Sequence, residues 1–141
     1  MVEEVLREVD WRLEEKLLAV VGLGFLVGRP IAVWAMRRAR NTLLFHKDSD
    51  FALVAEADLV VTGVGKSGVV RPEMLREGAG VIDFGYDQGR GDLAPECLST
   101  NIAFYTPTPG GTGPILVAKL IENFVLLNAP APRPAAQTRE R

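Results

Sequence analysis

Apolar residues gather in short runs along the chain, separated by segments rich in glycine and proline. Leu17 to Val21 is apolar at every position, and Leu59 to Thr62 and Val81 to Phe84 each carry only one polar residue. Runs without polar alternation predict strands that are covered on both faces, as in a parallel sheet. Thr42 to Phe45 and Ile102 to Phe104 are shorter candidates. The pattern therefore predicts about five strands.

Helical spacing appears between these runs. Val2 to Val9 has apolar residues three and four positions apart, and Val27 to Ala39 is predicted to be a helix with Trp34 and Met36 facing the core. Short helices are predicted at Phe51 to Ala57, Pro72 to Arg76 and Pro95 to Leu98, and a last helix, apolar almost all round, at Pro114 to Leu127. Strands alternating with helices predict an α/β fold: a Rossmann-type, doubly wound parallel sheet with helices on both faces.

Length and composition predict one folded domain. The chain has 141 residues, 48% of them hydrophobic. We expect residues 1–128 to form this domain and residues 129–141, which are rich in proline and alanine and then polar, to be a disordered tail.

Charge and cysteine content exclude several function classes. The net charge is -2, and acidic and basic residues are mixed along the chain. This pattern predicts neither a nucleic-acid partner nor binding to a membrane surface. The longest uncharged run, Leu17 to Gly28, is too short to span a membrane. One cysteine, Cys97, predicts a reducing, cytoplasmic location, and no leader segment or metal site is apparent.

The strongest chemical signal is the turn after the first predicted strand. Gly22, Gly24 and Gly28 are followed by Pro30, which fits the first turn of a helix. A strand, a glycine turn and a helix start are typical of a dinucleotide site, where the backbone approaches the pyrophosphate and the helix N-terminus faces it. A turn that serves only packing is the alternative.

Further glycine loops follow the later strands. They lie at Gly63 to Gly68, Gly85 to Gly91 and Gly110 to Gly113. Because the carboxyl ends of parallel strands share one edge, these loops are expected to meet there and form a ligand site.

One of these loops carries a specific resemblance. Thr106 to Pro114 resembles the T-P-V-P-G-G-V-G-P segment of the bifunctional methylenetetrahydrofolate dehydrogenase/cyclohydrolase family. Gly22 to Pro30 is similar to its G-x-S-x-x-V-G-x-P turn, and Val64 to Gly68 is similar to its V-G-K-P-G loop. Val81 to Gly85 and Gly91-Asp92 are similar to its V-I-D-V-G and G-D-V motifs.

The resemblance implies a nicotinamide cofactor, NADP with NAD as the alternative, and hydride transfer in one-carbon folate metabolism with a linked cyclohydrolase activity. By position it implies cofactor contacts at Gly22, Leu23, Gly24, Val27, Gly28, His46, Lys47, Val64, Gly65 and Tyr86. It places Pro109, Gly110, Gly111, Thr112 and Gly113 on the folate side of the cleft.

The end of the second predicted strand bears on cofactor choice. An acidic residue at this point binds the ribose of NAD, whereas a cation suits the 2′-phosphate of NADP. Lys47 offers a cation and so favours NADP. Leu23, where the family often has arginine, and Asp48, one residue further on, reduce the expected preference.

Members of this family also carry an N-terminal folate-binding domain with a catalytic lysine four residues after a tyrosine. No Tyr-x-x-x-Lys occurs here, since Tyr86 is followed by Arg90 and Tyr105 by Pro109 at that spacing. We therefore predict no catalytic residue in this chain, and folate binding only with a missing or separate N-terminal domain. The apolar last helix predicts a homodimer.

Three functions remain open from the sequence. The chain is the cofactor domain of a folate dehydrogenase, a stand-alone NAD(P)-binding or sensor module without catalysis, or part of another dehydrogenase. The motif at Thr106 to Pro114 argues against the third.

For several single residues the sequence favours a structural or unreactive role over a catalytic one. Lys66 is expected to be solvated, Cys97 to be an unreactive thiol, and Asp83 to bind loop N–H groups. Trp11 is either packing for the first helix or an exposed remnant of a domain join.

Overall fold

A computed structural model of the protein describes residues 1–129 and contains one parallel sheet of five strands. The strands are β1 (Leu17–Val21), β2 (Asn41–Phe45), β3 (Leu59–Thr62), β4 (Gly80–Asp83) and β5 (Phe104–Tyr105). Their order is β2-β1-β3-β4-β5, and every neighbouring pair is parallel. The predicted doubly wound α/β fold is confirmed.

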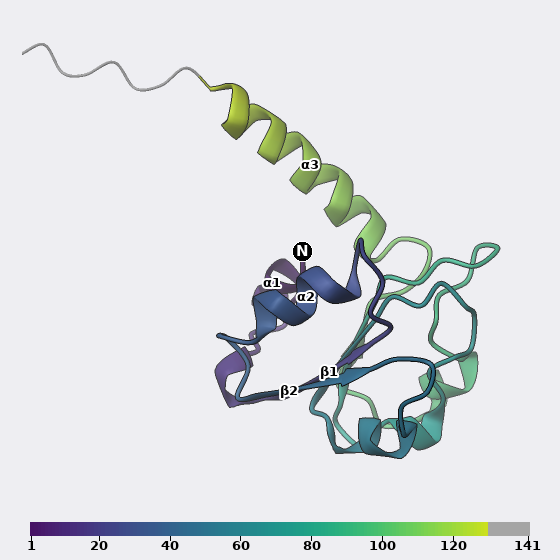
Figure 1. Cartoon of the computed structure of the whole chain (residues 1–141). Helices are drawn as coiled ribbons and strands as arrows, with labels where there is room; N and C mark the ends of the chain where they lie inside the picture. The colour runs from purple at the N-terminus through teal and green to yellow at the C-terminus, as the bar shows by residue number, and fades with distance from the viewer. Residues whose placement is uncertain (130–141) are drawn as a thin grey trace, which may run out of the picture.

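One face of the sheet is covered by two helices (Figure 1), α1 (Val2–Glu8) and α2 (Gly28–Ala35). Alternate strand residues such as Leu18, Val20 and Ile82 are buried against them. Trp11 belongs to this core as packing, because its ring meets the ring of Phe104 edge to face at a centroid distance of 5.0 Å. Val2, Val5 and Leu6 of α1 are buried in the same core, so this helix covers β1, β3 and β4.

The opposite face is covered by short 3₁₀ helices instead of α-helices. Residues Ala19, Val21 and Val60 of the strands pack there with Val54 of η2 (Phe51–Glu56). Met74 of η3 (Pro72–Met74) packs on this face too, whereas Leu13 of η1 (Leu13–Glu15) belongs to the core under α1 and α2. A further 3₁₀ helix is η4 (Pro95–Ser99). Asp50 caps η2, because its carboxylate accepts a hydrogen bond from the N–H of Ala52 at 3.0 Å.

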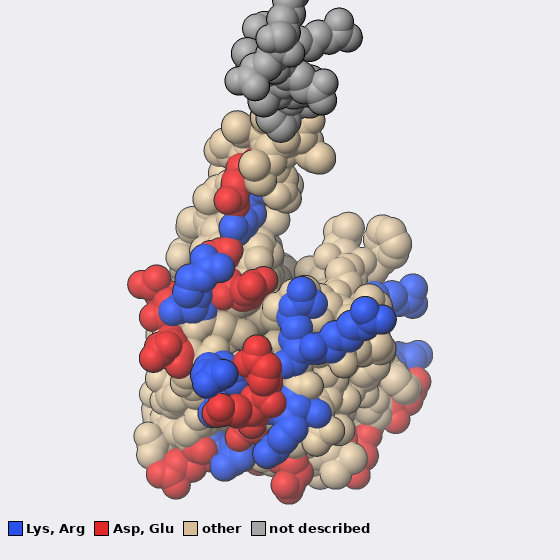
Figure 2. Space-filling view, turned by 90° about the vertical axis from the view of Figure 1, so that its left-hand side faces the viewer, with Lys and Arg blue, Asp and Glu red and all other residues tan. Residues whose placement is uncertain are grey.

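The last helix, α3 (Thr112–Asn128), projects away from the sheet (Figure 1). None of its residues is buried. Lys119, in the N-terminal half of α3, forms an ion pair with Glu4 of α1 at 2.7 Å. Figure 2 shows α3 as a column of mostly uncharged surface with a narrow charged stripe. Within residues 1–129, no helix has the length and apolarity needed to cross a membrane.

Several predicted boundaries are wrong. The helix predicted at Val27 to Ala39 runs from Gly28 to Ala35. Of the two residues predicted to face the core, Trp34 packs against it and Met36 is exposed (62%). The strand predicted at Ile102 to Phe104 begins two residues later and ends one residue later, at Phe104–Tyr105. The helix predicted at Val2 to Val9 ends at Glu8. The three short helices are 3₁₀ turns. Apart from Ala129, the predicted tail lies outside the described residues.

Candidate functional site

The predicted glycine loops all follow the carboxyl ends of strands and so share one edge of the sheet. Gly22 directly follows β1 and has φ +86°, a left-handed conformation that favours glycine. Gly28 begins α2 against the end of β1: a Cβ atom on Gly28 would overlap the backbone carbonyl of Gly22. Helix and strand therefore meet as closely as a dinucleotide-binding turn requires.

The loop after β3 packs directly on this turn. A Cβ atom on Gly22 would meet Val64 Cγ2 at 2.8 Å, and one on Gly63 would meet Val27 Cβ at 3.0 Å. The structure thus brings the predicted contacts Gly22, Val27 and Val64 together, and Gly65 follows in the same loop. Gly24 is exposed, and nothing would lie within 4 Å of a Cβ atom there.

A shallow cavity of about 580 Å³ lies beside the ends of β1 and β2. Four of the predicted cofactor contacts line it: Gly22, Leu23, His46 and Lys47. Arg29, which the sequence analysis missed, lines the same cavity, and its Nε donates to the Leu23 carbonyl at 3.0 Å. The cavity is therefore lined by two basic side chains, Arg29 and Lys47.

The turn after β2 is fixed by its own hydrogen bonds. The N–H of His46 donates to Ser49 Oγ at 2.9 Å, and the N–H of Asp48 donates to His46 Nδ1 at 3.2 Å. The carboxylate of Asp48 lies 3.8 Å from the same ring nitrogen. Asp48 thus turns toward His46 and does not line the cavity that Lys47 lines.

A second, more apolar cleft of about 610 Å³ lies on the other side of the turn. Of the remaining predicted contacts, Val27, Tyr86 and the segment from Pro109 to Gly113 line this cleft, whereas Gly24, Gly28, Val64 and Gly65 line neither cavity. Thr112 directs its hydroxyl into the protein, where Oγ1 donates to the Asp83 carbonyl at 3.1 Å. The residues that line the cleft include no carboxylate, histidine, lysine or arginine, so Tyr86 is its only ionisable side chain.

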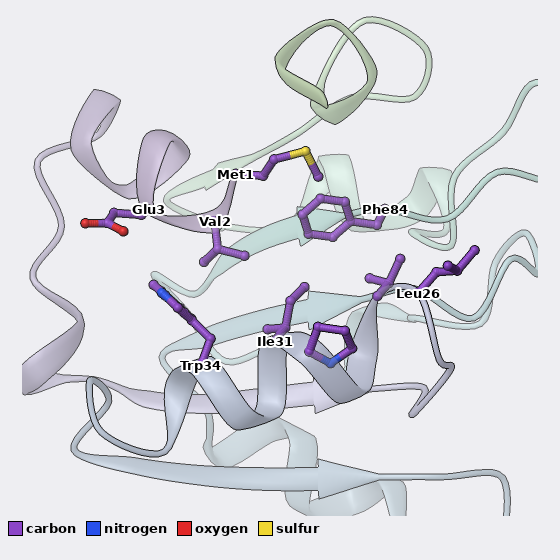
Figure 3. A pocket seen from close by; sticks show the side chains of 9 residues that line it. Met1, Val2, Glu3, Leu26, Ile31, Trp34 and Phe84 are labelled. Carbon is purple, nitrogen blue, oxygen red and sulfur yellow. The ribbon is translucent and has the colours of Figure 1, made fainter. Parts of the chain in front are cut away.

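This cleft continues into a groove of about 250 Å³ between α1 and α2 (Figure 3). Val2 and Ile31 face one another across the groove, and Phe84 and Leu26 lie at its end. Met1, Leu26, Val27 and Phe84 line both the groove and the cleft. The sequence analysis did not find this groove, because its residues come from three stretches that lie far apart in the sequence, 1–3, 26–34 and 84.

Two buried carboxylates lie beneath the loops. Asp83 accepts hydrogen bonds from the N–H groups of Gly85 at 2.7 Å and Leu93 at 2.9 Å, which confirms its predicted role. Burial raises the pKa of Asp83, and those N–H groups partly oppose the rise. Asp92 accepts from the loop after β3. The sequence analysis did not assign a role to Asp92.

The other two single-residue candidates, Lys66 and Cys97, line neither cavity. Lys66 is exposed, as expected for a solvated lysine. Cys97 is fully buried, and burial raises the pKa of its thiol to about 11. A buried thiol at neutral pH is not a nucleophile, which agrees with the expected unreactive cysteine.

Residues 1–130 match the family described as "Tetrahydrofolate dehydrogenase/cyclohydrolase, NAD(P)-binding domain". The bifunctional protein FolD of Mycoplasmopsis synoviae is 35% identical over 131 residues, which are 88% of this chain and 47% of that protein. FolD of Staphylococcus aureus strain Newman is 32% identical, over 89% of this chain and 46% of that protein. The chain thus spans about half the length of the curated relatives it matches.

Solved structures agree with the sequence comparison. The crystal structure of FolD from Campylobacter jejuni has a TM-score of 0.83 at 31% identity, and the match covers 89% of this chain and 47% of that one. FolD of Trypanosoma brucei, solved in complex with NADP and an inhibitor, has a TM-score of 0.79 at 29% identity, with 88% and 47% covered.

Proposed function

Because the chain belongs to the tetrahydrofolate dehydrogenase/cyclohydrolase family, as its NAD(P)-binding domain, we propose that its glycine loops bind NADP for hydride transfer from methylenetetrahydrofolate. The observation that carries the proposal is the convergence of Gly22, Val64, Lys47 and Tyr86 on one edge of the sheet. The pyrophosphate lies over the turn that begins at Gly22, where α2 directs its N-terminus.

Each of the two cavities binds one half of the cofactor. The cavity with Arg29 and Lys47 takes the adenosine half, since cations there attract a 2′-phosphate. The apolar cleft with Tyr86 takes the nicotinamide, whose ring needs a dry surface during hydride transfer. The segment from Pro109 to Gly113 then forms the folate side, so that the pterin ring and the nicotinamide meet in one cleft.

The cleft supplies binding and orientation but no acidic or basic side chain apart from the Tyr86 phenol. We therefore expect the chain on its own to bind NADP but to be inactive as a dehydrogenase and as a cyclohydrolase. Absence of a positioned acid or base costs about a hundred- to ten-thousand-fold in rate. A folate-binding domain on the same or a separate chain supplies the catalytic lysine.

The exposed apolar surface of α3 supports the proposal that a second domain packs on this chain. Leu120, Ile121 and Phe124 of α3 are each about 60% exposed or more, and Leu116 joins them to the cleft. We propose that the folate-binding domain covers this surface, and that two copies of the chain cover it for one another when that domain is absent. The prediction of a homodimer rests on this exposure.

A test of the function measures cofactor binding and turnover in the same preparation. Calorimetry should show saturable binding of NADP to the purified chain, while the oxidation of methylenetetrahydrofolate stays at the uncatalysed rate. Addition of a separately expressed N-terminal half of a FolD relative should restore turnover. Turnover by the chain alone would contradict the proposed division of roles, and absence of NADP binding would refute the function itself.

The second candidate is an NAD(P)-binding or sensor module without catalysis. The observation in its favour is the lack of acid and base side chains in the cleft. The same experiment separates the two, because a sensor module binds NADP yet gains no turnover from any folate-binding domain.

A further inference from the structure

Asp92 lies beneath the centre of the carboxyl edge and is fully buried. Its carboxylate accepts four hydrogen bonds. Oδ2 accepts from the Thr62 hydroxyl at 2.7 Å and from the N–H of Val64 at 2.6 Å, and Oδ1 accepts from the N–H groups of Gly65 and Lys66, both at 2.9 Å. One carboxylate therefore holds three consecutive N–H groups of the loop after β3 and the end of that strand.

This arrangement decides which groups the loop offers to a ligand. A glycine loop at the end of a strand commonly presents successive N–H groups to a phosphate. Here the N–H groups of Val64, Gly65 and Lys66 are already bound to an internal anion, so they are not available to a cofactor phosphate. The loop instead offers the side chain of Val64, which is 43% exposed.

The position of Val64 matters because the loop touches the glycine turn. The gap between Gly22 and Val64 is too narrow for a methyl group, and so is the gap between Gly63 and Val27. A displacement of the loop would therefore change the surface on which the dinucleotide lies. Gly85 is constrained by the same carboxylate, since a Cβ atom there would overlap Asp92 Oδ1.

We propose that Asp92 is a positioning residue for the cofactor: its buried carboxylate fixes the loop from Val64 to Lys66 against the turn at Gly22, so that Val64 forms part of the dinucleotide surface. The proposal rests on the proposed function, because it concerns NADP binding at that edge. It differs from a purely structural role, in which loss of the carboxylate lowers stability and leaves cofactor affinity unchanged.

The test compares Asp92→Asn with Asp58→Asn. Asp58 is the matched control, because its carboxylate also accepts a backbone N–H, that of Leu17 at 2.7 Å, but at the amino edge of the sheet. Both variants should lower the melting temperature. Only Asp92→Asn should weaken NADP binding, by about tenfold in calorimetric titration, because the asparagine amide cannot accept from two of the four donors.

Hydrogen exchange in the wild-type chain tests the geometry without any variant. The N–H groups of Gly65 and Lys66 lie outside strands and helices, yet they should exchange at least about a hundredfold more slowly than in an unstructured chain. Thr62→Val, which removes one donor and keeps the carboxylate, should weaken NADP binding by about two- to threefold, and it replaces Asp92→Asn if that variant does not fold.

The outcomes separate the two claims. Absence of NADP binding by the wild-type chain refutes the proposed function. If the wild type binds and Asp92→Asn matches it within about twofold, or if Asp58→Asn weakens binding equally, the positioning role of Asp92 is refuted while the function stands. Fast exchange of Gly65 and Lys66 would also overturn the positioning role.

Discussion

Lys47, after β2, and Arg29, in the first turn of α2, bring two positive charges to the cavity beside β2. Lys47 is predictable from its place after the second strand. Arg29 is not, because it occupies the second position of α2 and reaches back to the Leu23 carbonyl. Position 23 is leucine in this chain, and Arg29 brings a guanidinium to the cavity that Leu23 lines.

The two cations should favour NADP over NAD. Each exposed contact with the 2′-phosphate contributes about 1 kcal/mol, which is about fivefold in affinity. Lys47→Ala and Arg29→Ala should therefore each reduce the ratio of NAD to NADP dissociation constants by about that factor, with NAD affinity almost unchanged. Asp48→Ala is the control, because Asp48 does not line the cavity. Unchanged ratios in both variants would show that neither side chain selects the cofactor.

Cys97 should be protected from thiol reagents in the folded chain. Burial raises the pKa of its thiol from 9.0 to about 11, so the folded state binds the proton more tightly than the unfolded state. At pH 8 a neutral disulfide reagent should react about a hundredfold more slowly with the folded chain than with the chain in guanidinium. Fast reaction in the absence of denaturant would contradict the burial of this side chain.

The same pKa gives a dependence of stability on pH. Well below pH 9 both states carry the protonated thiol, and Cys97 contributes no slope. As the pH rises from about 9 to 11, the unfolded state releases its proton first, so the free energy of unfolding should fall. Chemical unfolding at several pH values measures this, and Cys97→Ser should lose this part of the decline.

At the scale of elements, the turn between β1 and α2 tolerates a side chain at one glycine and not at another. Gly28→Ala places a methyl group on the Gly22 carbonyl, and overpacking of this kind costs about 1–3 kcal/mol. Gly24→Ala is the control, since nothing lies within 4 Å of the added atom, and surface changes of this kind stay within about 0.5 kcal/mol. Equal unfolding midpoints in urea for the two variants would contradict the close approach of α2 to β1.

The strands that pack on both faces are the elements that could be predicted from sequence. β1 begins and ends where its apolar run does, because a central strand of a parallel sheet must be apolar throughout. β5 could not be located, because only Phe104 and Tyr105 pair, with Gly80 and Val81, and that register is set by β4. The 3₁₀ turns were predicted as helices because four- to seven-residue apolar spacings do not distinguish the two.

The site was predictable in its loops and not in the residues that support them. Glycines after buried strands mark the edge of the sheet where a ligand binds. Asp92 could not be assigned from sequence, because its donors lie about thirty residues earlier in the chain and only the fold brings them together. The groove between α1 and α2 was missed for the same reason.

At the scale of the whole molecule, α3 is the feature that most needs a partner. Leu120 and Phe124 lie one helical turn apart on its apolar side and are 59% and 68% exposed. The isolated chain should therefore sediment as a dimer at micromolar concentration. Replacement of both residues by glutamate should give monomers without loss of the fold, because no residue of α3 is buried. A monomeric wild type would contradict this account of α3.

Glu122→Gln is the control for these substitutions. It lies on the charged stripe of α3, so this variant should stay dimeric.

The central claim is that the carboxyl edge of this sheet binds NADP. Backbone amide NMR of the labelled chain, titrated with NADP, tests it directly. The account predicts saturable shifts confined to the turn from Gly22 to Gly28, to His46 and Lys47, to the loop at Val64, and to Tyr86. Absence of saturable shifts, or shifts centred instead on the α1–α2 groove around Trp34, would contradict it.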